Sequence, residues 1–430
     1  MRRGIRRLTL GLGSAAVLAA ATACSTSSTS SAPASPAAST SASAASATAA
    51  ASATTGTSAG ASGAASGSCG SLPDIGYNDK SGLVAGLGSY AANYNGYNGT
   101  IYASPWSTWK GKTSGVKVGV LIDGLANPFQ TELENTLTAN LKAYGYSTVA
   151  LAPSSASITN QLQGYQTLLN DGVDMIILQA QSPTAYNALI DKAAKQGIPT
   201  VGVLNEVEDA NVVNVVPNTI LAMMKVAQYE VQQAQGKGTI LYMHGIPGVP
   251  IDTDGLNGTK DVTKLCPQIT LNDSLVTQFD PSIAKQVLLS YLNTHPQPVA
   301  GVIPAGPFSA GIFQAFQQSG KTVPVVANNG LDVGGLSYWI QHESSYKGVA
   351  VANTPNGLGT AVTTVAHKML EGDGVKINTL SIVPPVITTN SDLAKYVTTD
   401  SSWTLTSQGT ALGPASLYVS GSYLDAIFSK

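Results

Sequence analysis

The side chains best suited to chemistry are four histidines: His244, His295, His342 and His367. None belongs to a zinc or catalytic pattern, and the chain lacks both a Gly-x-Ser-x-Gly elbow and a phosphate-binding loop. His244 ends a predicted strand, where it either faces a ligand or is a satisfied structural residue. The segment from Asp252 begins like a calcium loop, but Thr263 stands where a carboxylate should be. The sequence therefore predicts a protein that is not an enzyme and has no cofactor or metal.

The N-terminus has the plan of an export signal. A basic start that ends at Arg7 precedes an apolar run of residues 8–20, which is too short to span a bilayer. The following Ala21-Thr-Ala-Cys24 resembles a bacterial lipobox with alanine in place of the usual leucine. We therefore predict that residues 1–24 are a lipoprotein signal peptide and that Cys24 is lipidated. The alternative is plain secretory cleavage, in which Cys24 is removed.

The next segment, residues 25–68, contains only Ala, Ser, Thr, Gly and Pro. Such a composition cannot bury a core and predicts a disordered linker with a reach of roughly 35 to 40 Å. With a lipid on Cys24, the linker would tether a globular body to the outer face of the cell membrane. Two cysteines then remain, Cys69 and Cys266, which either form a disulfide in this exterior compartment or stay as separate thiols.

The charge of the chain excludes one class of partner. All arginines lie at or before Arg7, and beyond that residue the 24 acidic side chains outnumber the lysines. This is the wrong sign for a nucleic-acid surface, so no nucleic acid is expected as a partner. Apolar residues make up 43% of the chain and charged residues only 11%, which suits an exported protein better than a cytosolic enzyme.

Beyond residue 115, short apolar strands alternate with amphipathic segments. A strand at 116–122 precedes a helical pattern at 129–144 in which Leu133, Leu137 and Leu141 share one stripe. The further strands are expected at 147–152, 175–179, 198–203, 238–244, 269–277, 301–303 and 323–327. The further helices are expected at 158–170, 184–196, 219–235, 256–265, 282–294 and 309–319. This alternation predicts two α/β lobes, each a doubly wound parallel sheet, with the best ligand site between them at the carboxyl ends of the strands.

The sequences at these strand ends resemble those of the type I periplasmic binding proteins of the ribose- and galactose-binding kind. The motifs that carry the resemblance are Asp123 to Gln130, Gly197 to Pro199, Gln278 to Pro281, Asn293 to Pro296 leading into Val299 to Ile303, Asn328 to Gly330, and Asn353 to Asn356. The resemblance covers roughly residues 116–390. It implies an N-terminal lobe of residues 116–217 plus 354–380, a C-terminal lobe of 218–353 plus 381–390, and a three-segment hinge near Pro217, Asn353 and Leu380.

The resemblance also implies a function. Such a protein would be an extracytoplasmic monomer that captures a small-molecule ligand, a sugar or polyol, between its lobes and delivers it to an ABC transporter permease. The rival from another class is a surface sensory or adhesive protein that uses the same cleft or its aromatic flanks.

Position by position, the family's ligand contacts fall on nine residues of this chain. They are Asp123, Asn127, Phe129, Gln130, Gln179, Asn205, Phe279, Asn329 and Asn353. Amides and carboxylates at strand ends would bind hydroxyl groups, and aromatic rings would stack on a sugar's C–H face. Structural alternatives are that Asn127 starts a helix, that Phe279 only packs, and that Asn353 caps a helix.

The chain departs from the family where the family's sugar binders carry charge. Their Asp-Arg pair after the Ile-Pro strand becomes Asn205-Glu206, a helical arginine becomes part of Asp252 to Asp254, and the last strand-end acid becomes Asn329. Because no arginine is available, bidentate clamps on a carboxylate or a sugar ring are absent. We therefore expect a small neutral hydroxylated ligand, since an anion would find no counter-charge.

Two segments lie outside the resemblance. Residues 69–115 form an N-terminal extension that we expect to be irregular and to pack along one lobe. Its functional alternative is a carbohydrate contact through the aromatic side chains of Tyr90, Tyr94, Tyr97 and Trp106. Residues 391–430 form a C-terminal extension that either covers an apolar patch or binds a partner.

Overall fold

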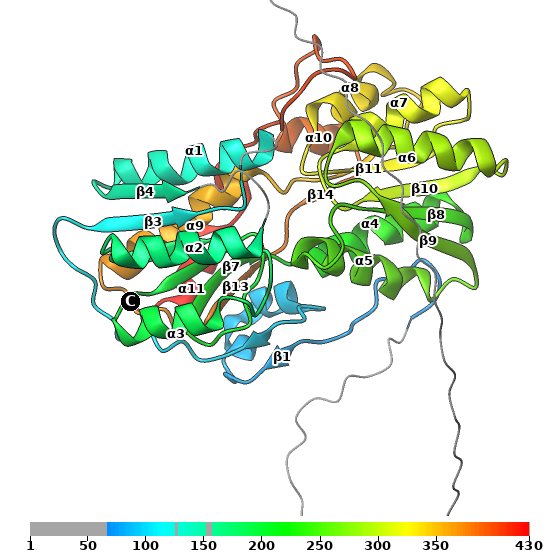
Figure 1. Cartoon of the computed structure of the whole chain (residues 1–430). Coiled ribbons are helices and arrows are strands. Elements are labelled where there is room, and N and C mark those ends of the chain that lie inside the picture. The colour runs from blue at the N-terminus through cyan, green and yellow to red at the C-terminus, as the bar shows by residue number, and fades with distance from the viewer. Residues whose placement is uncertain (1–66, 125–127, 152–156, 430) are drawn as a thin grey trace, which may run out of the picture. The chain divides into compact units, whose positions relative to one another are not determined.

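The chain after residue 115 forms two six-stranded sheets, one in each lobe (Figure 1). The computed structural model describes residues 67–124, 128–151 and 157–429, all of which belong to one compact unit. The predicted α/β architecture with two parallel sheets is confirmed. Within the described residues, no helix combines the length and apolar character needed to cross a membrane.

The N-terminal lobe is built on a fully parallel sheet of order β13-β7-β6-β5-β3-β4. Its strands are β3 (Lys117–Leu121), β4 (Ser147–Leu151), β5 (Met175–Leu178), β6 (Thr200–Val203), β7 (Val212–Pro217) and β13 (Thr379–Ile382). Its helices are α1 (Pro128–Ala143), α2 (Ile158–Asn170), α3 (Asn187–Lys195) and α9 (Pro355–Leu370). The stripe of Leu133, Leu137 and Leu141 is fully buried, as the helical spacing predicts. It packs with α9 on one face of the sheet, while α2 and α3 cover the other.

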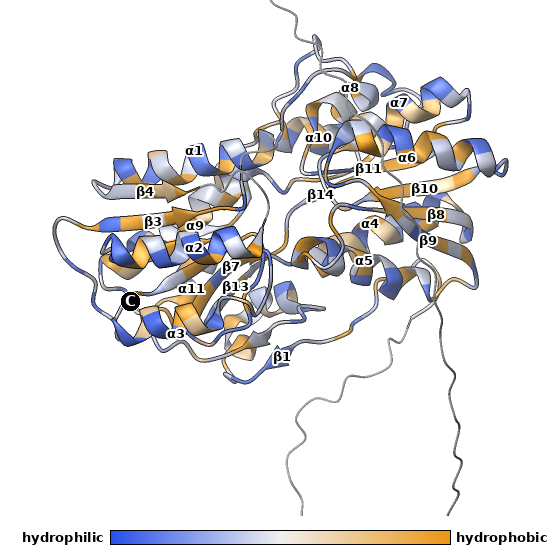
Figure 2. Ribbon diagram, in the orientation of Figure 1, coloured by the Kyte–Doolittle hydropathy of each residue, from blue (hydrophilic) through white to orange (hydrophobic). Residues whose placement is uncertain are grey.

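The C-terminal lobe repeats this plan with the order β14-β12-β11-β10-β8-β9. Its strands are β8 (Lys237–His244), β9 (Gln268–Val276), β10 (Val299–Pro304), β11 (Val325–Asn329), β12 (Val349–Val351) and β14 (Val386–Ile387), and only β14 runs antiparallel. Its helices are α4 (Thr219–Gln233), α5 (Pro250–Thr263), α6 (Pro281–Thr294), α7 (Ser309–Ser319), α8 (Val333–Gln341) and α10 (Asn390–Tyr396). Helices α4 and α5 cover one face and α6 and α7 the other. Figure 2 shows hydrophobic colouring along central strands of both sheets, such as β3 and β10.

Helix α5 begins six residues before the expected residue 256, and the reason lies in its glycines. Gly255 and Gly258 weaken the helical pattern because glycine is a poor helix former. In the fold, a Cβ atom on Gly258 would overlap the carbonyl of Ile220, and one on Gly255 would overlap the hydroxyl of Tyr242. Close packing of α5 on α4 and β8 thus requires the two glycines, and the same glycines weaken the helical pattern in the sequence.

The chain crosses between the lobes three times, after Pro217, near Asn353 and after Ile382. The third crossing lies two residues beyond the expected Leu380. The difference arises because β13 pairs with β7 as far as Ile382, which lies opposite Pro217. The part of the chain expected to join the C-terminal lobe therefore starts slightly later.

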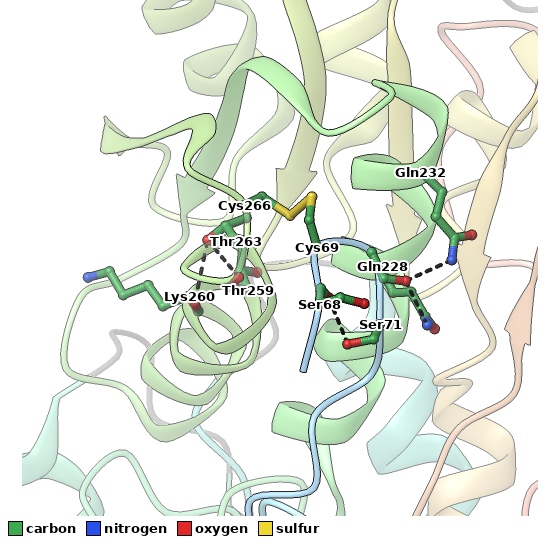
Figure 3. The surroundings of a disulfide bond; sticks show 10 residues. Ser68, Cys69, Ser71, Gln228, Gln232, Thr259, Lys260, Thr263 and Cys266 are labelled. Atoms are coloured by element: carbon green, nitrogen blue, oxygen red, sulfur yellow. Dashed lines mark hydrogen bonds between the residues drawn. A yellow bond between two sulfur atoms is a disulfide. The ribbon is translucent and has the colours of Figure 1, made fainter. Parts of the chain in front are cut away.

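The N-terminal extension contacts both lobes, so the expectation that it packs along one lobe is wrong. Cys69 forms a disulfide with Cys266, which follows α5, with the two Cα atoms 4.6 Å apart (Figure 3). The carbonyl of Gly70 accepts hydrogen bonds from Gln228 and Gln232 on α4, at 3.2 and 2.9 Å. The extension then forms β1 (Asn78–Asp79), the 3-10 helix η1 (Val84–Tyr94) and β2 (Thr100–Ile101), whose apolar side chains join the core of the N-terminal lobe.

Three of the four aromatic side chains considered for a carbohydrate contact are buried. Tyr94, Tyr97 and Trp106 are at most 7% exposed, so they offer no surface for carbohydrate. Tyr90 stacks on Tyr423, which lies on α11 (Gly421–Ile427) of the C-terminal extension. The two extensions therefore meet on the N-terminal lobe and complete its apolar core.

Candidate functional site

Three of the predicted ligand contacts lie side by side at the carboxyl edge of the N-terminal sheet. Asp123, Gln179 and Asn205 follow β3, β5 and β6, and these strands are neighbours in the order β6-β5-β3. The pairing of Leu121 with Leu178 places the first two ends together, and the Gln179 N–H donates to the carbonyl of Leu121 at 2.9 Å. The sheet thus brings together residues that are more than 80 positions apart in the chain.

Two buried amides at this edge each have an oxygen atom without a hydrogen-bond partner among the described residues. The Nδ2 atom of Asn205 donates to the carbonyl of Ala180 at 2.6 Å, so its Oδ1 atom is the remaining hydrogen-bonding group. Neither this oxygen nor Oε1 of Gln179 has a hydrogen-bond partner within the described part of the chain, and both residues are at most 2% exposed. Buried polar atoms are normally paired. The edge therefore holds two unused acceptors.

The carboxyl groups near this edge are held in a poorly solvated environment. Burial raises the pKa of Asp123 to about 7. Burial and then the carboxylate of Asp254 raise the pKa of Glu206 to about 8, while the Tyr97 hydroxyl lowers it. Asp254 also accepts a hydrogen bond of 2.7 Å from Asn98 of the N-terminal extension. Near neutral pH these groups bind protons readily, which makes them usable as donors or acceptors to a neutral ligand.

The first helix supplies the remaining N-terminal contacts. Phe129 is 6% exposed on α1, and its Cδ2 atom lies 3.9 Å from the position that a Cβ atom on Gly330 would occupy. This ring from the N-terminal lobe therefore reaches the end of β11 in the C-terminal lobe. Gln130 is partly buried one position later. Asn127 lies outside the described residues.

Phe279 forms a platform at the carboxyl edge of the C-terminal sheet. Its ring covers Gly245 after β8 and Gly306 after β10, because a Cβ atom on either glycine would overlap or crowd it. The ring is partly exposed and makes an edge contact with Phe308, with centroids 6.4 Å apart. Glycines at these two strand ends thus allow an aromatic face to lie against the sheet edge.

Backbone strain concentrates at the same strand ends. Five described non-glycine residues have positive φ, and four of them lie within three residues of the end of a strand in one of the two sheets: Leu204, Gln278, Phe279 and Leu331. Such conformations cost of order 1 to 3 kcal/mol each and persist where the surrounding structure enforces them, often at binding sites. The strained residues include Phe279 and lie within two positions of Asn205 and Asn329, which are three of the predicted ligand contacts.

The two remaining asparagines are buried and partly committed to protein contacts. Asn329 donates from Nδ2 to the carbonyl of Ala305 at 3.1 Å. Asn353 accepts a hydrogen bond of 2.7 Å from the hydroxyl of Tyr418, a buried residue of the C-terminal extension. Sequence reasoning missed this contact, because nothing in the spacing of Tyr418 relates it to a residue 65 positions away.

The strand-end loops carry no lysine or arginine side chain. No lysine occurs in 122–124, 179–183, 204–208, 244–248, 277–280, 304–308, 329–332 or 352–356, and the chain has no arginine beyond Arg7. Of the acids in these loops, Asp280 caps α6 and Asp332 holds the first turns of α7 and α8. Among the described residues, no cluster of His, Cys, Asp or Glu could bind a metal ion. The arrangement suits binding of a neutral ligand and offers no catalytic set.

Replacing Gly245 with alanine should displace the Phe279 ring, because the new methyl group would occupy the position of the ring atoms. We expect ligand affinity to fall about tenfold or more, as overpacking of this kind costs roughly 1 to 3 kcal/mol. Titration calorimetry of the variant measures the effect. Gly86→Ala is the matched control, because a Cβ atom there meets no neighbour within 4 Å. Unchanged affinity in the Gly245 variant would remove Phe279 from the site.

Comparisons with known proteins support the fold described above. The family model for the periplasmic binding protein domain matches residues 118–374. The ribose import binding protein of Bacillus subtilis is 22% identical over 260 residues, which cover 60% of this chain and 83% of the relative. A xylitol-binding protein of Mycolicibacterium smegmatis is 23% identical over 290 residues, covering 66% of this chain and 81% of the relative.

The solved structures share the fold. An ABC transporter solute binding protein from Mycobacterium smegmatis with bound glycerol aligns with a TM-score of 0.60 at 20% identity. The alignment covers 67% of this chain and 99% of that protein. The residues that the family model leaves unmatched include the N-terminal extension, residues 69–115, and the C-terminal extension, residues 391–430.

Proposed function

Because the chain belongs to the periplasmic binding protein family, and is thus an extracytoplasmic binding protein and not an enzyme, we propose that it captures a sugar or polyol between its lobes. The observation that carries this proposal is the set of polar and aromatic groups at the carboxyl ends of both sheets. Asp123, Gln179 and Asn205 come from one lobe, and Phe279 and Asn329 from the other. A ligand that bonds to both sets would favour the closed arrangement of the lobes.

The ligand class follows from the hydrogen-bonding groups. A neutral polyhydroxyl compound donates to carboxylates and amide oxygens and accepts from protonated carboxyls. Relatives named for ribose and xylitol, and a structure that contains glycerol, support small hydroxylated ligands of this kind. We propose that the bound ligand is then released to an ABC permease, as the resemblance implies.

A ligand screen tests the proposal. D-ribose, xylitol and glycerol should be added to the full-length protein in a thermal-denaturation assay. A ligand at a hundred times its dissociation constant adds about 2.7 kcal/mol to the free energy of unfolding, which raises the melting temperature. Stabilisation by at least one of these compounds is expected. If none of these three compounds raises the melting temperature, and no hexose or inositol does so either, the proposal is contradicted.

The same assay tests the charge of the site. D-ribonate carries a carboxylate on the carbon skeleton of D-ribose, and the strand-end loops have no lysine or arginine to pair with it. We expect D-ribonate to bind at least about a hundredfold more weakly than D-ribose, because a buried unpaired charge costs several kcal/mol. Equal binding of the two compounds would show that a cationic group has been overlooked.

We also propose that the protein is a monomer anchored by a lipid on Cys24. Residues 1–66, which include the predicted signal peptide, Cys24 and all of the predicted linker except residues 67 and 68, lie outside the described residues. Mass spectrometry of the N-terminal peptide from the mature protein would reveal a diacylglycerol adduct on Cys24. A Cys24→Ala variant should move from the membrane fraction to the medium, whereas an unchanged distribution would rule out this anchor.

A further inference from the structure

A histidine and an aspartate form a buried pair at the end of β8. The Nδ1 atom of His244 lies 2.7 Å from Oδ2 of Asp252, in the first turn of α5. The other carboxylate oxygen, Oδ1, accepts a hydrogen bond of 2.7 Å from the backbone N–H of Gly245. Asp252 is 1% exposed, and both of its oxygens are therefore committed to this strand end.

Asp252 does not act as a cap for its own helix, although its position in the first turn of α5 would allow it. An aspartate in the first turn of a helix commonly accepts hydrogen bonds from the free N–H groups there. The carboxylate of Asp252 instead bonds to the ring and the backbone N–H of the facing strand, and its own carbonyl accepts from the Tyr242 hydroxyl at 2.8 Å. The aspartate thus fixes the orientation of the His244 ring.

This contact also fixes the tautomer of neutral His244. An ionised carboxylate can only accept, so the hydrogen of the neutral ring is on Nδ1 and the lone pair is on Nε2. No residue in the described part of the chain forms a hydrogen bond with Nε2. The side chain is 11% exposed, and its Nε2 atom is not fully buried. His244 therefore has an oriented acceptor with solvent contact.

The neighbours of His244 belong to the candidate site. The N–H and hydroxyl of Thr277 both donate to the carbonyl of His244, at 2.9 and 2.7 Å, and Thr277 is two residues before Phe279. On the other side, the N–H of Ala305 donates to the carbonyl of Met243, and Ala305 accepts from Asn329. His244 thus lies between the two segments that contact the predicted ligand residues Phe279 and Asn329.

We propose that His244 is a ligand contact of this site, where its Nε2 atom accepts a hydrogen bond from a hydroxyl group of the bound sugar or polyol. Asp252 is its positioning residue. This inference rests on the proposed function and adds to it an acceptor with defined direction. Nε2 is an acceptor, and the charged groups that interact with the ring are Asp252 and, on β9, Asp273, which is itself paired with Lys260 of α5 at 2.9 Å. The ligand group at this point should therefore be a hydrogen-bond donor.

Two variants separate ligand contact from structure. His244→Phe keeps a ring of similar size but removes the acceptor, and we expect it to weaken binding of D-ribose or xylitol about tenfold. In Asp252→Asn, an amide N–H faces Nδ1 and moves the ring hydrogen to Nε2, which turns the acceptor into a donor. Nitrogen NMR of the histidine ring should show the Nδ1–H form in the wild type and the Nε2–H form in the variant. His295→Phe, at an exposed histidine, is the matched control.

Chemical protection gives an independent result. Diethyl pyrocarbonate should modify His244 in the free protein, and saturating D-ribose or xylitol should block this reaction while leaving exposed His295 reactive. If a probe binds and His244 stays reactive, or His244→Phe binds as tightly as the wild type, the inference is overturned while the proposed function stands. If no sugar or polyol binds at all, the proposed function fails and this inference falls with it.

Discussion

Raising the pH from 5 to 8 is expected to lower the protein's free energy of unfolding by several kcal/mol. Burial raises the pKa of Asp332 to about 6, that of Glu206 to about 8 and that of Glu230 well above its usual range. Above about pH 4.5 the unfolded chain releases these protons, whereas the fold retains them. The contribution of each group to the free energy of unfolding is therefore complete at pH values below the pKa of that group in the unfolded chain. As the pH rises further, the contribution falls by about 1.4 kcal/mol per pH unit until the pKa of the group in the folded protein is reached.

Glu230 isolates this effect in a single side chain. It is fully buried on α4, and neither carboxyl oxygen has a partner in normal hydrogen-bond geometry among the described residues. Glu230→Gln should flatten the pH dependence by up to about 1.4 kcal/mol per pH unit. Urea unfolding at several pH values measures it, with Glu343→Gln, an exposed acid, as the control. Stability that rises between pH 5 and 8 would contradict the account.

Removing the disulfide with Cys266→Ser is expected to destabilise the protein by about 2 to 4 kcal/mol. The bond joins residues separated by 197 positions, so it strongly restricts the unfolded chain. It also fastens the N-terminal extension to the C-terminal lobe, where the carbonyl of Gly70 accepts two hydrogen bonds from α4. Denaturant unfolding in oxidising buffer measures the loss.

Reduction supplies the control for this prediction. The wild type in reducing buffer should match Cys266→Ser, because both lack the bond. Limited proteolysis should then cut the chain between Cys69 and Tyr77 faster in the variant. Equal stability of wild type and variant in oxidising buffer would show that the extension is held by packing alone.

Much of the fold was predictable because it depends on local pattern. The stripe of Leu133, Leu137 and Leu141 has helical spacing, and the short apolar strands have no polar face, which is typical of a parallel sheet covered on both sides. Helix α5 was misplaced because Gly255 and Gly258 serve contacts with α4 and β8. Those contacts belong to the tertiary structure and leave no periodic signal.

The candidate site was predictable in part. The family resemblance places Asp123, Gln179 and Asn205 at strand ends, and strand ends in a parallel sheet meet at one edge. The contact between Tyr418 and Asn353 and the insertion of Asn98 next to Asp254 could not, because both extensions lie outside the shared family pattern.

The most direct test of the central claim is a calorimetric titration of D-ribose and xylitol into the wild type and two variants, one for each lobe. Asn205→Ala alters the N-terminal lobe and Asn329→Ala the C-terminal lobe, with exposed Asn135→Ala as the control. If one ligand bonds to both lobes, each site variant should weaken binding by roughly 1 to 3 kcal/mol. Binding that neither variant changes, or that depends on one lobe only, would contradict capture between the lobes.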